Sequence, residues 1–127
     1  MFDSDEASKR LGISIDIPAP GQAVAVMPVR DDMLNGFGIC HGGYIFTLAD
    51  TAFAFACNAY NDMTVAAAGS IEYLQPVHAG DRLEASAVEE YREGRRGFYT
   101  VTITRGDDDV VALFRGRSTA RSEPLLK

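Results

Sequence analysis

The stretch that decides the fold is NGFGICHGGYIFTLADTAFAFACN, residues 35–58. Its first part is a glycine-rich turn, and the part after residue 43 lacks proline and glycine over more than a strand's length, which predicts a helix over 43–58. The polar members of this helix fall within about 100° around its axis; they are Thr47, Asp50, Thr51 and Asn58. The rest is apolar, so the helix is expected inside the protein. Because an unpaired charge is costly to bury, Asp50 is a candidate functional residue.

The composition is that of one folded domain, expected to span residues 1–127, with 46% apolar and 24% charged residues. No apolar run reaches membrane length, and the acidic start MFDSDEASKR lacks a signal-peptide core. We therefore expect a cytoplasmic protein with no membrane partner. The net charge of −6 argues against nucleic acid as a partner. Two cysteines and two histidines without ligand spacing predict neither a disulfide framework nor a metal site.

The flanking sequence alternates in a way that is typical of strands. A short helix is expected over residues 3–11, capped by Ser4 and ended by Gly12. Six strands are predicted, over residues 13–17, 22–29, 64–74, 82–92, 97–105 and 110–120. Short turns between the later strands predict an antiparallel meander, and residues 121–127 are expected to form a loose tail. This order predicts an α+β fold in which a curled antiparallel sheet wraps one long central helix.

A family resemblance is carried by three stretches, MLNGFGICHGGYIFTLADTAFAFACN, SIEYLQPVHAGD and VALFRGRS. Together they resemble the hotdog-fold acyl-CoA thioesterases, and most closely the thioesterase family of bacterial phenylacetic acid degradation. The resemblance spans residues 5–120. It implies a hotdog fold, hydrolysis of aryl- or arylacetyl-CoA thioesters, and homodimers that pair into homotetramers. It implies no separate cofactor, because CoA is part of the substrate.

The same resemblance implies roles for four residues of the central stretch. Asp50 would be the catalytic carboxylate, and the backbone N–H of Gly42 would be the oxyanion donor. Asn35 and His41 would be supporting polar residues. For His41 we expect that the imidazole holds the loop by binding a backbone carbonyl.

Thioester hydrolysis needs a base or nucleophile, an oxyanion donor and a slot for the acyl group. Asp50 could activate water or attack the carbonyl directly, and the sequence leaves both open. The first N–H groups of a helix have no internal partners, which suits Gly42 as the donor. Gly43 is expected to let the substrate approach closely. Thr51 is expected to favour the ionised form of Asp50 and to contact the substrate.

Several residues also have simpler explanations. Asp50 could be a structural carboxylate bonded to a backbone turn, and the residues 41–43 could be no more than a tight turn. A Cys40–His41 nucleophile is disfavoured because adjacent side chains at a helix start diverge. An aryl slot could be lined by Phe53, Phe55 and Tyr73, although apolar residues on such elements are usually core.

Two other functions fit the same fold. A hydratase or dehydratase acting on acyl thioesters would need a histidine and carboxylate pair, and fold alone does not decide function. A non-catalytic acyl-CoA sensor should carry an output segment such as a DNA-binding helix pair, and no such segment is visible in the sequence. Turnover of a saturated arylacetyl-CoA separates a thioesterase from both.

The spacing of the candidate residues predicts that two subunits build each site. Gly42 and Asp50 are eight residues apart, about 12 Å along a helix axis, so one helix cannot easily place both at one carbonyl. Two such helices, side by side and antiparallel, could place one Gly42 opposite the other Asp50 twice over. Pairing the sheets edge to edge would also cover exposed edge strands. We therefore expect a homodimer with shared active sites.

Overall fold

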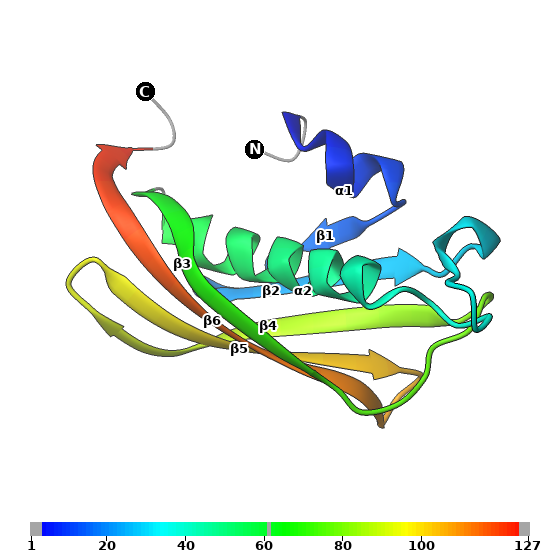
Figure 1. The fold of residues 1–127 in the computed structure, drawn as a ribbon. Helices are drawn as coiled ribbons and strands as arrows, with labels where there is room; N and C mark the ends of the chain where they lie inside the picture. Colours follow the sequence, from blue (N-terminus) through cyan, green and yellow to red (C-terminus); the bar gives the residue numbers. More distant parts are fainter. Residues whose placement is uncertain (1–3, 61, 125–127) are drawn as a thin grey trace.

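One long helix lies against the concave face of a curled, six-stranded antiparallel sheet in the computed structural model, which describes residues 4–60 and 62–124 (Figure 1). The helix, α2, spans Gly42–Cys57 and agrees with the predicted helix over 43–58. The strands are β1 (Ser14–Asp16), β2 (Gln22–Pro28), β3 (Asp62–Tyr73), β4 (Arg82–Glu93), β5 (Arg96–Arg105) and β6 (Asp109–Pro124). The predicted α+β architecture is confirmed.

The strand order, β1-β2-β4-β5-β6-β3, differs in one respect from the predicted meander. The strands β4, β5 and β6 follow one another as expected, but β3 pairs with β6, with Ile71 opposite Phe114. The connection over residues 74–81 therefore crosses from one edge of the sheet to its middle. Residues 67–70 of β3 are all exposed, so this strand lacks the buried face that a central position would need.

The two ends of the chain also correct the expectations. The N-terminal helix α1 (Glu6–Arg10) is capped by Asp5 rather than Ser4, because the Asp5 carboxylate accepts the Ser8 N–H at 3.1 Å. Strand β6 continues to Pro124, paired with β3, so the prediction of a loose tail is wrong for residues 121–124. Residues 125–127 lie outside the described part.

The core lies between α2 and the inner face of the sheet. Alternate residues of β4 are buried against the helix, as the sequence predicted, and so are those of β5; they include Leu83, Ala85, Ala87, Tyr99, Val101 and Ile103. Phe53 packs where a side chain on Gly116 of β6 would meet its ring at 2.8 Å. A glycine at 116 thus lets the helix seat deeply on the sheet, which fixes the element that carries the candidate site.

Candidate active site

The loop before α2 is closed on itself by hydrogen bonds of Asn35. A short 3-10 turn, Asp31–Met33, precedes it, and a bridge joins Leu34 to the chain at residue 40. The Asn35 Oδ1 accepts the backbone N–H groups of Phe37 at 2.9 Å and Ile39 at 3.3 Å. Asn35 therefore shapes the loop that delivers the helix start. This is a supporting position, and contact of Asn35 with substrate stays a prediction.

The helix start is fixed by backbone bonds that leave two donors unused. The N–H groups of residues 40 and 41 donate to the carbonyls of Val77 at 2.7 Å and Met33 at 2.8 Å. The next two N–H groups, of Gly42 and Gly43, have no acceptor within the part of the chain that is described. Unpaired N–H groups at a helix start favour negative charge. The arrangement can therefore accommodate an oxyanion.

Tyr73, at the end of β3, covers Gly42. Its hydroxyl donates to the Gly42 carbonyl at 2.9 Å, and a Cβ on Gly42 would lie 2.8 Å from the Tyr73 Cζ. No atom lies within 4 Å of a Cβ built on Gly43. Burial raises the pKa of the Tyr73 hydroxyl, although 51% of the residue is exposed. Sequence reasoning gave Tyr73 only as a wall of the acyl slot and missed its bond to the helix start.

The His41 side chain does not make the bond expected of it. The residue is exposed, and its ring lies edge-on to Tyr44 with 6.5 Å between centroids. Its imidazole forms no hydrogen bond with any described residue, whereas its backbone N–H holds the turn through Met33. The expected imidazole–carbonyl bond is therefore wrong, because the ring points out at the helix start rather than back into the loop. A supporting role of His41 toward substrate remains a prediction.

Asp50 is a half-buried carboxylate on the third turn of α2. No described residue donates a hydrogen bond to it, and none forms an ion pair with it. Burial raises the pKa of Asp50, and the negative charge of Asp5 raises it further. An unpaired, desolvated carboxylate with a raised pKa is typical of functional sites. The alternative of a structural carboxylate bonded to a turn is not supported.

Thr51 is engaged by the chain itself. It is buried, its hydroxyl donates to the Thr47 carbonyl at 2.7 Å, and its Oγ1 lies 3.0 Å from the Ser8 Oγ. Ser8 in turn donates to the Asp5 carboxylate at 2.7 Å. The expected contacts of Thr51 with substrate and with the Asp50 carboxylate are therefore not seen. The signal that sequence reasoning missed is the serine of the short first helix, which packs on α2.

Neither cysteine is suited to act as a nucleophile. Both are buried and free of disulfides. Desolvation raises the pKa of Cys40, with a further contribution from Asp81, and raises that of Cys57 to about 12. The Cys40 thiol faces the His41 carbonyl at 3.5 Å rather than its imidazole. Because the thiolate is the reactive form, these thiols are structural.

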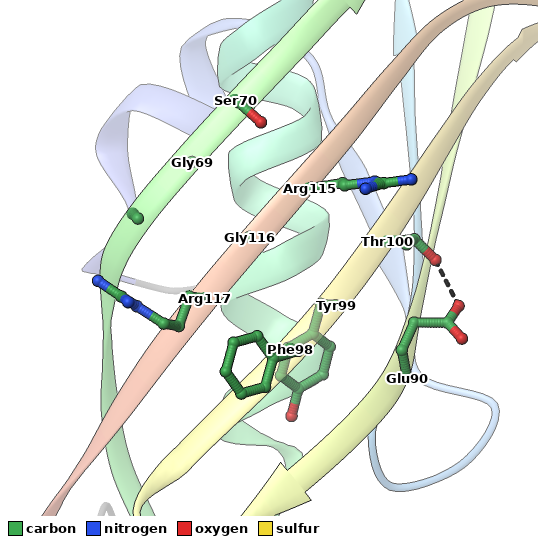
Figure 2. A pocket seen from close by; sticks show the side chains of 10 residues that line it. Gly69, Ser70, Glu90, Phe98, Tyr99, Thr100, Arg115, Gly116 and Arg117 are labelled. Carbon is green, nitrogen blue, oxygen red and sulfur yellow. Dashed lines mark hydrogen bonds between the residues drawn. The ribbon is translucent and has the colours of Figure 1, made fainter.

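Two of the three aromatic residues proposed for the acyl slot belong to the core. Phe53 and Phe55 are 1% and 6% exposed, and Phe53 contacts the rings of Tyr99 and Phe114. A hollow of about 760 Å³ lies elsewhere, across β3, β4, β5 and β6. Figure 2 shows Arg115, Arg117 and Phe98 in it, with α2 behind the strands; residues 42 and 50 are not among those lining it.

Two searches of the described residues gave no site or span. No group of three or more histidine, cysteine, aspartate or glutamate side chains is placed to hold a metal ion. No helix there has both the length and the apolar character needed to cross a membrane.

Comparison with known proteins gives concordant matches. The profile of the thioesterase superfamily matches residues 37–112. The acyl-coenzyme A thioesterase PaaI of Escherichia coli K12 is 45% identical over 118 residues, which cover 93% of this chain and 84% of that protein. The structure of E. coli PaaI, from the phenylacetic acid degradation operon, superposes with a TM-score of 0.94 at 43% identity, covering 98% of this chain and 90% of the other. The TT0310 protein of Thermus thermophilus gives 0.84 at 39%, with coverage of 89% and 95%. The likeness to PaaI confirms the predicted hotdog fold.

Proposed function

The chain belongs to the thioesterase superfamily, and from this premise we propose that it hydrolyses aryl- or arylacetyl-CoA thioesters to the free acid and CoA. Its identity as an acyl-CoA thioesterase follows from its likeness to PaaI over nearly its full length. The preference for an aromatic acyl group goes further. It is supported by the origin of E. coli PaaI in the phenylacetic acid degradation operon and by the exposed Tyr73 ring beside the helix start.

In the proposed reaction the thioester carbonyl oxygen faces the Gly42 N–H. Asp50 takes a proton from water while the water oxygen bonds to the carbonyl carbon, and the oxyanion forms on the helix start. Collapse of this intermediate breaks the carbon–sulfur bond, and the CoA thiolate leaves with a proton. Direct attack by Asp50 would give an anhydride that water then opens. A single turnover in ¹⁸O-water distinguishes the two, because only attack by Asp50 places unlabelled carboxylate oxygen in the acid.

The observation that carries this proposal is the Asp50 carboxylate, which is half-buried and without a partner among the described residues. Its raised pKa makes it a better base than an exposed aspartate, while leaving it ionised near neutral pH. The unpaired N–H groups at the start of the same helix supply the complementary donor. Asn35 and His41 support the loop and the substrate around this donor, and Gly43 leaves room for close approach.

The proposed site is shared by two copies of the chain. Strand β3 is an edge of the sheet, pairing with β6 alone, and several of its apolar residues are exposed: Met63 at 38%, Val65 at 43% and Tyr73 at 51%. An apolar edge of this kind invites pairing with another strand. A two-fold axis along it would set two α2 helices side by side and bring each Gly42 toward the partner's Asp50. Pairing of such dimers into a homotetramer is proposed from the family resemblance.

The test is release of free thiol from a panel of acyl-CoA substrates that includes phenylacetyl-CoA, benzoyl-CoA and acetyl-CoA. Phenylacetyl-CoA also excludes hydration, because it has no double bond next to the carbonyl. The proposal predicts that the aromatic substrates have the highest kcat/KM, and that Asp50→Asn abolishes release from all of them. A folded chain that releases no thiol would contradict the activity, and a preference for acetyl-CoA would contradict the aromatic specificity.

A further inference from the structure

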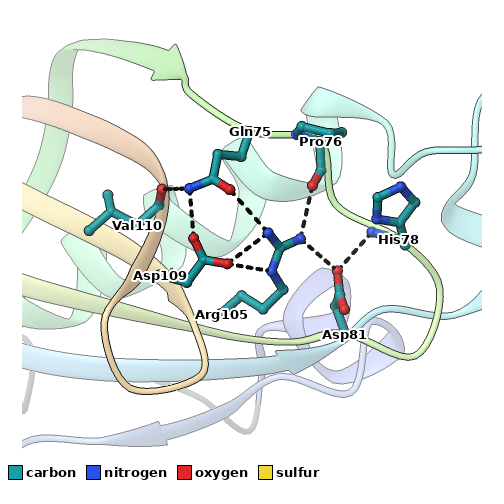
Figure 3. Close-up of polar contacts among 7 residues, drawn as sticks. All are labelled: Gln75, Pro76, His78, Asp81, Arg105, Asp109 and Val110. Atoms are coloured by element: carbon teal, nitrogen blue, oxygen red, sulfur yellow. Dashed lines mark hydrogen bonds and ion pairs between the residues drawn. The ribbon is translucent and has the colours of Figure 1, made fainter.

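Arg105, at the end of β5, binds the connection between β3 and β4 through several hydrogen bonds (Figure 3). Its Nη1 donates to the Pro76 carbonyl at 2.9 Å and to the Asp81 carboxylate at 3.1 Å. Its Nη2 donates to the Gln75 Oε1 at 3.2 Å. The opposite side of the guanidinium binds Asp109 at 2.8 and 2.9 Å. One planar group thus clamps residues 75–81 onto the hairpin of β5 and β6.

The clamped connection holds the start of α2 at two points. Before the clamp, the Tyr73 hydroxyl donates to the Gly42 carbonyl at 2.9 Å. After it, the Val77 carbonyl accepts the Cys40 N–H at 2.7 Å. Pro76, whose carbonyl binds Arg105, lies between these two points in the chain. Any movement of the connection is therefore transmitted to both sides of the glycine turn.

Other contacts fix the far end of the connection. The Val29 N–H donates to the Asp81 carbonyl at 2.8 Å, and the Gly80 N–H donates to the Val29 carbonyl at 2.9 Å. The Asp81 carboxylate accepts the His78 N–H at 2.9 Å. Although partial burial acts to raise it, hydrogen bonds from the His78 N–H and from Arg105 hold the pKa of Asp81 below its ordinary value. The acceptor for Arg105 is therefore ionised at neutral pH.

We infer that Arg105 is a positioning residue for the reaction: by clamping residues 75–81 it holds the Gly42 N–H where the thioester oxygen becomes an anion. The inference rests on the proposed function. It requires arginine rather than any cation, because a planar guanidinium can donate in several fixed directions at once, whereas a lysine ammonium acts as a point charge. Arg105 does not itself touch the substrate.

The test compares Arg105→Gln and Arg105→Lys with Arg96→Gln as a matched control. Arg96 pairs with Glu93 at 3.2 Å in the exposed hairpin of β4 and β5, away from the connection. Arg105→Gln should lower kcat about 10-fold, because a displaced donor fits the transition state less well, and should leave KM within about twofold. Arg105→Lys should be intermediate, and Arg96→Gln should match the wild type. All assays run well below the melting temperature of each variant.

Hydrogen–deuterium exchange supplies a readout that does not depend on activity. In Arg105→Gln, exchange should rise in residues 38–44 and 74–81 while the strand centres stay protected. Unchanged exchange in residues 38–44, or a wild-type kcat, would overturn the inference. So would a rise in exchange throughout the chain with kcat unchanged, which would mark Arg105 as a stability residue only. If the wild-type chain released no thiol, the proposed function would fail, and the exchange experiment alone would decide whether Arg105 holds the turn.

Discussion

Replacing Gly42 with alanine places a methyl group against the ring of Tyr73. The new Cβ would lie 2.8 Å from the Tyr73 Cζ and 2.9 Å from its Oη, well inside the ordinary carbon contact of about 3.5–4.0 Å. Because Tyr73 is half exposed, its ring can swing toward solvent rather than distort the backbone. That movement breaks the hydrogen bond to the Gly42 carbonyl, and we expect it to cost about 1 kcal/mol of unfolding free energy.

A double-mutant cycle isolates this cost from the helix propensity of alanine, which by itself favours the substitution by up to about 1 kcal/mol. The cycle combines Gly42→Ala with Tyr73→Ala, and urea unfolding is measured at one fixed protein concentration. In the Tyr73→Ala background the collision is gone, so the two substitutions should couple by about 1 kcal/mol. Gly43→Ala is the control, because no atom lies within 4 Å of its added Cβ, and it should be neutral or stabilising.

The same variants report on catalysis. If Tyr73 fixes the peptide that presents the oxyanion donor, Gly42→Ala should also lower kcat about 10-fold, while Gly43→Ala should have a smaller effect. Equal changes in stability with and without the Tyr73 ring, together with a wild-type kcat for Gly42→Ala, would refute the reasoning.

Three further predictions concern single residues. Asp50→Asn should lower turnover about 100-fold or more; because burial raises the pKa of Asp50, its ionised form destabilises the fold, so this variant should be more stable than the wild type near pH 7. That gain should shrink as the pH falls through the raised pKa and vanish below the ordinary value of about 3.9, and a gain that persists in acid would contradict this account. Cys40→Ser should keep nearly full turnover, since the thiol is buried and protonated; an inactive but folded variant would restore it as a nucleophile. Thr51→Val should lose about 1 kcal/mol of stability with KM unchanged, because the hydroxyl binds Ser8 rather than substrate; a raised KM at unchanged stability would argue for substrate contact.

The elements could be predicted because each leaves a local pattern in the sequence. The long helix follows from an uninterrupted apolar run, and the buried faces of β4 and β5 follow from alternation such as Leu83, Ala85 and Ala87. The pairing of β3 with β6 could not be read in the same way, because it depends on contacts between segments far apart in the chain. The local hint was the run of small residues at 66–69, which gives no buried face.

The candidate site shows the same division. Asp50 and the glycine turn were predicted because a carboxylate in an apolar helix and two adjacent glycines are conspicuous in the sequence alone. The bonds that hold them were not, since Tyr73, Val77 and Arg105 reach the turn from later strands and their connection. The wrong expectations for Thr51 and for the His41 ring have a common cause, because both side-chain directions are set by packing that the sequence does not display.

The shared site is the central claim, and mixing two inactive chains tests it most directly. One chain carries Asp50→Ala and the other Gly42→Pro, which removes the donor N–H at a helix position that accepts proline. Each is first shown to fold and to be inactive alone, and the mixed dimers are isolated with two different affinity tags. A site built from both subunits predicts that each mixed dimer regains one intact site, about half the wild-type activity per dimer. Mixed dimers that stay inactive, or a monomer with full activity, would contradict it.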